Sequence, residues 1–160
     1  GSVAVLAGIV AALSFAVARI APHRPASVVE ALALDVPAGL YLGWATVATV
    51  ANVTAAATWY LDLASDEGMP AAVGVVAAVA LLGIAIARDL GSSPVLAWAT
   101  TATFAWGLAW IGLGRLEAEP QEPVVGYAAL AAAGLVVLAT LITTVLAAVR
   151  RLRARMRAES

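Results

Sequence analysis

The chain contains no cysteine and no lysine, and it has a single histidine, His23. Without cysteine, disulfide bonds and thiolate metal sites are excluded. His23 stands between two prolines in a predicted loop, where a metal site would need further ligands nearby, so no metal is expected. All nine basic residues are arginines, and the formal net charge of −1 offers no general surface for nucleic acid.

Charged residues are also scarce. They make up 12% of the 160 residues, whereas a soluble domain carries roughly 25%. The 63% of hydrophobic residues fall into five blocks, each long enough or nearly long enough to cross a bilayer of about 30 Å as a helix. A soluble bundle would need a polar outer face. The sequence therefore predicts an all-α, polytopic transmembrane helix bundle with five transmembrane helices.

The predicted bundle forms one transmembrane domain over residues 1–149, and an arginine-rich tail follows at 150–160. We expect its helices at about residues 3–21, 36–60, 71–87, 95–113 and 124–149. Pro37 suits the first turn of the second helix, where a missing N–H costs nothing. The preceding segment SVVEALAL could form a short interfacial helix.

The arginines are distributed unequally between the two sides of this bundle. With five spans, eight of the nine arginines lie on the side of the tail, and only Arg115 lies on the other side. The positive-inside rule then predicts a cytoplasmic tail and an N-terminus on the outside. The tail itself has two interpretations. It is a topology anchor attracted to anionic lipid at about 1 kcal/mol per residue, or a site for nucleic acid or a partner protein.

The stretch LYLGWATVATVAN, residues 40–52, carries polar and aromatic side chains that a helix would not need merely to span lipid. On a helix, one face is shared by Tyr41, Trp44, Ala48 and Asn52. An amide in hydrocarbon without a partner costs several kcal/mol. We therefore expect Asn52 to face other helices or a polar cavity, with Trp44 on the same side.

Two further features concern helix packing and the remaining tryptophans. Gly39 and Gly43 form a GxxxG step that lets another helix approach closely. The fourth predicted helix has a stripe of residues spaced four apart, namely Trp98, Ala102, Trp106 and Trp110. Tryptophans near helix ends are typical of the interfacial belt, which suits Trp59, Trp98 and Trp110. Trp44 and Trp106 lie deeper, which favours a packed or ligand-facing role.

The segment YLGWATVATVAN resembles the last transmembrane helix of the TspO/MBR family, also called tryptophan-rich sensory proteins or translocator proteins. That helix reads Tyr-Leu-x-Trp, then a run of small residues or Thr, then Asn eight residues after the Trp. The resemblance implies a five-helix bundle with an aromatic-lined pocket for tetrapyrroles, sterols or synthetic ligands. The candidate ligand-binding residues are Tyr41, Trp44, Ala48, Thr49, Asn52 and, from the fourth predicted helix, Trp106.

The chain also departs from that family pattern. In the family the motif closes the fold, whereas here three more predicted helices follow it. The chain begins Gly-Ser without an initiator Met, and the family's earlier aromatic signature is absent. By the resemblance, we expect the C-terminal part of a longer bacterial protein in the inner membrane. Residues 3–21 and 36–60 would then correspond to the family's fourth and fifth helices, and the later helices would be an added segment.

The residues inside the predicted spans offer little for catalysis. They include no carboxylate, His or Cys to act as acid, base or nucleophile, and Asp35 and Asp62, which flank the second span, are expected to be solvated. A proton-coupled transporter usually needs an ionisable group within the membrane. A passive pocket needs only shape, stacking and a few hydrogen bonds.

The leading hypothesis is therefore a non-enzymatic, TspO-related sensory membrane protein that binds a flat hydrophobic ligand such as a tetrapyrrole. The alternative is a permease or a structural subunit of a membrane complex. The expected partners are membrane lipids, a hydrophobic small molecule and a second copy of the chain in a homodimer, with no nucleic acid. No cofactor is expected beyond a tetrapyrrole ligand.

The predicted orientation can be tested by cysteine labelling, because the chain has no cysteine of its own. Single cysteines are introduced between residues 62 and 68 and between residues 150 and 158. An impermeant external reagent should label the first set and spare the second, since eight of nine arginines lie on the side of the tail. Labelling of the 150–158 sites from outside would overturn this orientation.

Overall fold

A computed structural model of the chain describes residues 2–22, 25, 27–61, 65–119 and 121–159. The described backbone is almost entirely helical, which confirms the predicted all-α class. The elements are α1 (Ser2–Ile20), α2 (Val28–Glu30), the π-helical turn η1 (Ala31–Asp35), α3 (Val36–Leu61), α4 (Ser65–Asp89), α5 (Pro94–Glu117) and α6 (Pro123–Ala158).

Among the described residues, four helical segments are long and apolar enough to cross a membrane, judged by length and composition. They are Val28–Ala56, Met69–Asp89, Pro94–Glu117 and Pro123–Ala158, and Ala4–Ile20 is a shorter apolar helix. The described part of the chain thus has five apolar helices, each overlapping one of the predicted ranges, and the first is the shortest.

The second membrane helix begins earlier than residue 36, because α2, η1 and α3 form one continuous helical run. The Ser27 hydroxyl caps its start by accepting the Glu30 N–H at 3.1 Å. Pro37 lies inside this run and not in its first turn. Its ring would clash with the carbonyl four residues earlier in a regular α-helix. The wider turn directly before it, where the Val36 N–H bonds to the Ala31 carbonyl, relieves this contact.

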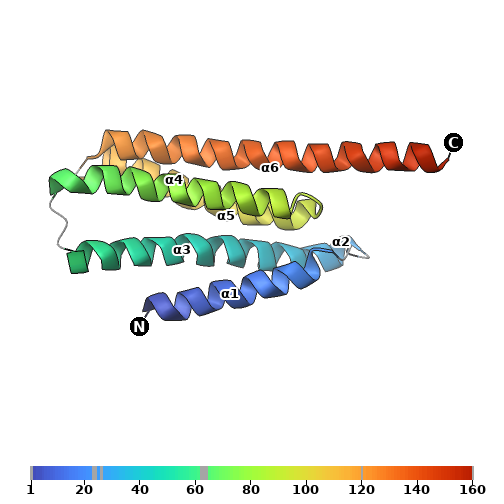
Figure 1. The fold of residues 1–160 in the computed structure, drawn as a ribbon, viewed down its shortest axis with the longest axis horizontal. Helices are drawn as coiled ribbons and strands as arrows, with labels where there is room; N and C mark the ends of the chain where they lie inside the picture. Colours follow the sequence, from blue (N-terminus) through green and yellow to red (C-terminus); the bar gives the residue numbers. More distant parts are fainter. Residues whose placement is uncertain (1, 23–24, 26, 62–64, 120, 160) are drawn as a thin grey trace.

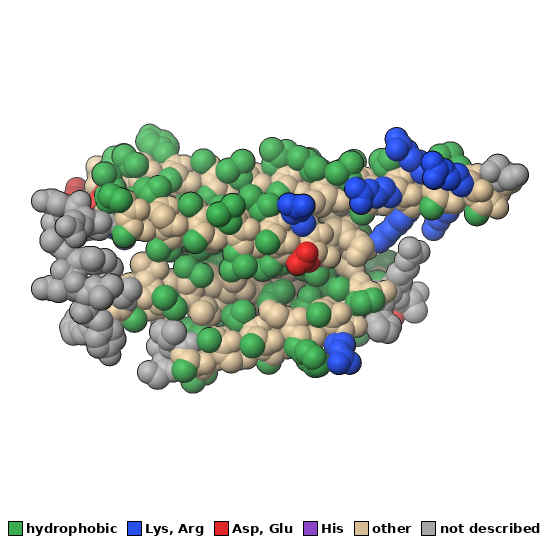
Figure 2. All heavy atoms as spheres, viewed as in Figure 1, with side chains coloured by type: hydrophobic (Ala, Val, Ile, Leu, Met, Phe, Trp, Pro, Cys, Tyr) green, Lys and Arg blue, Asp and Glu red, His purple; other side chains and the backbone are tan. Residues whose placement is uncertain are grey.

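The helices lie side by side in the order α1, α3, α5, α6, and α4 packs mainly on α6 with lesser contacts to α5 and α3 (Figure 1). α6 extends beyond the other helices at its C-terminal end (Figure 1). Arginines gather at this end of the bundle (Figure 2), and we call it the arginine-rich end. It is where α1 and α4 end and α5 begins.

α3 and α5 are parallel, and they approach closely because glycine occupies their contact. A Cβ added to Gly39 would lie 2.7 Å from the Ala99 Cβ, and one added to Gly43 would lie 2.6 Å from the Thr100 carbonyl oxygen. Further along, Gly107 of α5 lies against the side chain of Val47. The GxxxG step therefore acts as the sequence predicted, within the chain and toward α5.

The core lies among α4, α5 and α6. Phe104, Leu108 and Val136 are fully buried there. Buried hydroxyls are also satisfied, since Thr101 and Thr140 hydrogen-bond to each other across α5 and α6 at 2.6 Å. The Thr140 hydroxyl also donates to the Val136 carbonyl of its own helix at 3.0 Å.

The glycine contact predicts a strong dependence of stability on Gly43. Gly43→Ala should destabilise the bundle by about 1–3 kcal/mol, because its methyl group would overlap Thr100 and Thr103. Gly134→Ala is the matched control, since a Cβ there meets nothing within 4 Å, and it should be neutral or stabilise α6 by up to about 1 kcal/mol. Thermal unfolding in detergent measures both. Equal unfolding midpoints for the two variants would contradict the α3–α5 packing.

Candidate functional site

Tyr41 and Trp44 of α3 lie on the outer surface of the bundle. Their side chains are 46% and 53% exposed. The two rings stack on each other, with centroids 5.7 Å apart and planes inclined by 10°. The pair therefore presents a flat aromatic surface to the surroundings of α3.

A second aromatic pair lies on α5. Trp106 is 67% exposed, and Trp110, one turn further along, is also exposed. Their ring centroids are 5.6 Å apart in an edge-to-face arrangement, with planes inclined by 64°. The pair thus projects two indole rings from a single helix face.

The two pairs share one side of the molecule. In a helix, residues two apart point in nearly opposite directions. Thr46, two residues after Trp44, is buried, and Phe104, two residues before Trp106, is buried against Gly83 of α4. Both exposed indoles therefore point away from the buried core. Trp44 directly follows Gly43, which faces α5, and Trp106 directly precedes Gly107, which faces α3. Because the two helices are parallel, both indoles lie on the same side of the α3–α5 contact. We call the surface formed by Tyr41, Trp44, Trp106 and Trp110 the aromatic face.

The remaining candidates lie beside this face. Ala48 is half-buried and continues the stripe of Trp44 by one turn. Thr49 and Asn52 are half-buried too. Asn52 lies roughly 80° round the helix from Trp44, because eight residues exceed two full turns by that angle. Asn52 lies only about 20° from Tyr41, because eleven residues exceed three full turns by that angle, so it continues the stripe of Tyr41 and Ala48. Thr49 lies at the edge of this stripe, about 80° from Tyr41.

The polar groups of Thr49 and Asn52 are bonded within α3. The Thr49 hydroxyl donates to the Ala45 carbonyl at 2.7 Å, and the Asn52 amide nitrogen donates to the Ala48 carbonyl at 2.9 Å. Because the amide donor has a partner in its own helix, the cost of placing Asn52 in hydrocarbon falls. This local bond was not foreseen from the sequence, which suggested a partner on another helix or in a cavity.

Two cavities lie at the arginine-rich end. The first has a volume of about 540 Å³ and lies between the end of α4 and α6. The second, of about 490 Å³, lies where the end of α1 meets the start of α5. They share Ser92 and Arg151 as lining residues. None of the six candidate residues lines either cavity.

Asp35 corrects one expectation. The sequence suggested a solvated carboxylate, but Asp35 is only 7% exposed and lines the second cavity. The physical reason is the early helix start at Val28, which places Asp35 in a helical turn instead of at a helix end. The helical pattern of SVVEALAL was the signal that could have revealed this. Asp62, like His23, lies outside the described residues, as does the Trp59 side chain.

Within the described part of the chain, no group of three or more His, Asp or Glu residues is placed to hold a metal ion. The candidate site is the aromatic face, and the interactions that its rings can offer are stacking and apolar contact.

Four apolar helices of spanning length, packed through glycine and threonine, define a polytopic α-helical membrane protein. The chain belongs to the TSPO-like protein family, whose family model matches residues 1–142. No curated protein and no solved structure matches the chain. The family match continues through α4 and α5 into α6, so these helices belong to the family pattern and are not an addition to it.

Proposed function

We propose that this protein is a non-enzymatic, TspO-related sensory membrane protein that binds a flat hydrophobic ligand, such as a tetrapyrrole, on its aromatic face. The observation that carries the proposal is that two exposed aromatic pairs, Tyr41 with Trp44 and Trp106 with Trp110, project from the adjacent helices α3 and α5. Membership of the TSPO-like family supports the same class of function.

The aromatic face suits a planar apolar ligand for a physical reason. An indole ring offers a large flat surface, and a stacked aromatic contact is worth about 0.5–1.5 kcal/mol beyond the burial of area. Trp44 is already held flat by Tyr41 at 5.7 Å, so little side-chain freedom is lost on binding. A hydrophobic ligand dissolved in the bilayer reaches this surface from the lipid side.

The neighbouring small and polar residues complete the proposed site. Ala48 carries only a methyl group, which leaves room beside the Trp44 ring. Thr49 and Asn52 form the adjoining edge, and their hydrogen bonds to the Ala45 and Ala48 carbonyls hold both side chains against the helix. These residues therefore shape the border of the site, while the indoles supply the contact area.

The proposed setting is the bacterial inner membrane, with the tail after residue 150 in the cytoplasm. The distribution of arginines supports this orientation. Membrane lipids are the expected surroundings of the exposed apolar side chains.

The same open face favours a second candidate function. A surface of exposed aromatic side chains can be covered by another protein surface instead of a ligand. The chain would then be a subunit of a permease or of a larger membrane assembly, in the simplest case a homodimer. Ligand-binding measurements on the aromatic residues separate the two functions.

Replacing the indoles should weaken porphyrin binding. Trp44→Leu and Trp106→Leu each remove one stacking surface and keep the outer face apolar. We expect each to raise the dissociation constant for protoporphyrin IX roughly two- to tenfold, the equivalent of about 0.5–1.5 kcal/mol. Titration of the full chain in detergent, followed by the absorbance of the porphyrin, measures the change.

Tyr127→Leu is the matched control, because Tyr127 is an exposed aromatic residue on α6, outside the aromatic face. Its affinity should equal that of the unmodified chain. Equal affinities in all three variants, with the helical content intact, would exclude the aromatic face as the porphyrin site and favour the subunit function.

A further inference from the structure

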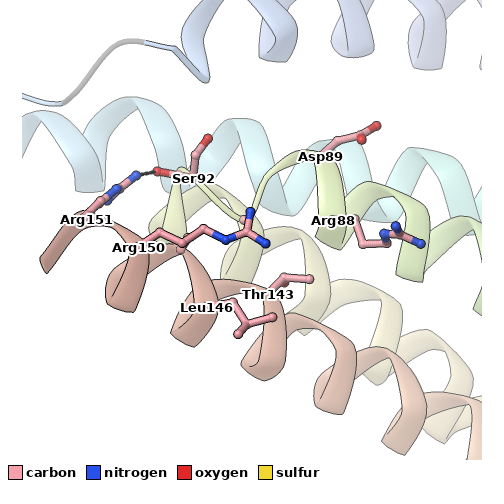
Figure 3. A pocket seen from close by; sticks show the side chains of 9 residues that line it. Arg88, Asp89, Ser92, Thr143, Leu146, Arg150 and Arg151 are labelled. Atoms are coloured by element: carbon pink, nitrogen blue, oxygen red, sulfur yellow. Dashed lines mark hydrogen bonds between the residues drawn. The ribbon is translucent and has the colours of Figure 1, made fainter. Parts of the chain in front are cut away.

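The first cavity at the arginine-rich end is lined by residues from two distant segments of the chain (Figure 3). Arg88 and Asp89 come from the end of α4, and Ser92 comes from the turn that leads into α5. Arg150 and Arg151 come from α6. Three guanidinium groups and one carboxylate thus surround a space of about 540 Å³.

The cavity walls are fixed by contacts that do not involve Arg88 or Arg150. The Thr143 hydroxyl of α6 lies 3.2 Å from the Ala87 carbonyl oxygen of α4 and shares its single proton between this carbonyl and those of its own helix. Gly91 packs closely against Thr143. The turn itself is closed by the Ser93 N–H bonding to the Leu90 carbonyl at 2.7 Å. A guanidinium nitrogen of Arg151 donates to the Ser92 carbonyl, which ties α6 to this turn. The space is therefore built by the fold.

The charged side chains are arranged asymmetrically around this space. Arg150 extends from α6 toward the α4–α5 turn (Figure 3). The Asp89 carboxylate lies on the other side of that turn, and both it and the Arg88 side chain are directed away from Arg150 (Figure 3). One carboxylate against three guanidinium groups leaves the cavity positively charged.

The position of the cavity along α6 corresponds to a membrane surface. α6 has 36 residues, so it is about 54 Å long, and the hydrocarbon layer is about 30 Å thick. Its C-terminal part therefore projects beyond the hydrocarbon. The cavity lies where α4 has just ended, beside the first two arginines of α6. Leu146, which is exposed, and Ala147 form its apolar side.

We propose that this cavity binds the phosphate group of an anionic membrane lipid. Arg150 would donate to the phosphate oxygens, because the planar guanidinium group matches phosphate in a bidentate geometry. Arg88 would turn its side chain from the position in Figure 3 to reach the same phosphate. Arg151, held by Ser92, adds fixed positive charge. The exposed side chain of Leu146 would lie beside the first part of the acyl chain. This apolar border, at the membrane surface, favours a lipid phosphate over free phosphate.

The proposal assigns the arginines two separate roles. Arg88 and Arg150 line a cavity, whereas Arg153 and Arg155 are exposed further along α6 and line neither cavity. Arg153 and Arg155 would act by general attraction to the anionic surface. The two pairs carry equal charge, so they form a matched comparison.

The test measures lipid binding to the full chain in neutral detergent by native mass spectrometry. The probe is dioctanoyl phosphatidylglycerol, with dioctanoyl phosphatidylcholine as the zwitterionic comparison. The double variant Arg88→Gln/Arg150→Gln should weaken phosphatidylglycerol binding at least tenfold. The control Arg153→Gln/Arg155→Gln removes the same charge and should change binding less than twofold. Thermal unfolding confirms that both variants are folded.

Two outcomes would overturn the proposal. Equal weakening by both double variants would mean that lipid responds to the total arginine charge and not to the cavity. In a separate arm, inorganic phosphate is added as a competitor. It should displace phosphatidylglycerol only at concentrations at least a hundredfold higher than those of the lipid. Displacement at equal concentrations would show a site for a soluble anion and contradict the lipid assignment.

Discussion

The contact between α3 and α5 is the constraint on which the rest of the structure depends. Gly39 and Gly43 contribute no side chain to this contact, so the α3 backbone approaches Ala99, Thr100 and Thr103 of the parallel helix α5 closely. Thr100, on the facing helix, bonds back to its own Leu96 carbonyl at 2.9 Å and needs no partner across the interface. The bulky aromatic residues of both helices are excluded from this contact. They project together on the outer surface, and the aromatic face is the result.

The helices themselves could be predicted from the sequence, because apolar runs of spanning length separated by proline, glycine and acidic residues leave few alternatives. The close helix contact at the GxxxG step could also be predicted, because small residues at this spacing favour close packing of two helices. Which side of α3 faces each neighbouring helix could not be predicted from the sequence. Periodicity gives the angle between Trp44 and Asn52 but not which neighbour each one meets. The burial of Asp35 depended on a helix start eight residues earlier than Val36, made compatible with Pro37 by a π-helical turn.

The two candidate sites also differ in how far they could be predicted from the sequence. The aromatic residues of α3 are close in sequence, so their stripe was visible before the structure, although only the α3–α5 contact shows that Trp106 joins it. The arginine-lined cavity unites residues 88–92 with residues 143–151, and no local pattern could connect them. The two sites lie in different parts of the molecule. An apolar surface within the membrane suits a hydrophobic ligand, and a basic cavity at the membrane surface suits a lipid phosphate.

The central claim is that Trp44 and Trp106 face the bilayer and are open to a molecule dissolved in it. The most direct measurement is fluorescence quenching by lipids brominated on their acyl chains, in bilayers holding variants that keep one tryptophan and carry phenylalanine at the others. A variant whose single tryptophan replaces Phe104, which is fully buried, serves as the protected control. We expect strong quenching of Trp44 and Trp106 and little quenching at position 104. Protection of Trp44 and Trp106 to the level of position 104 would contradict the account.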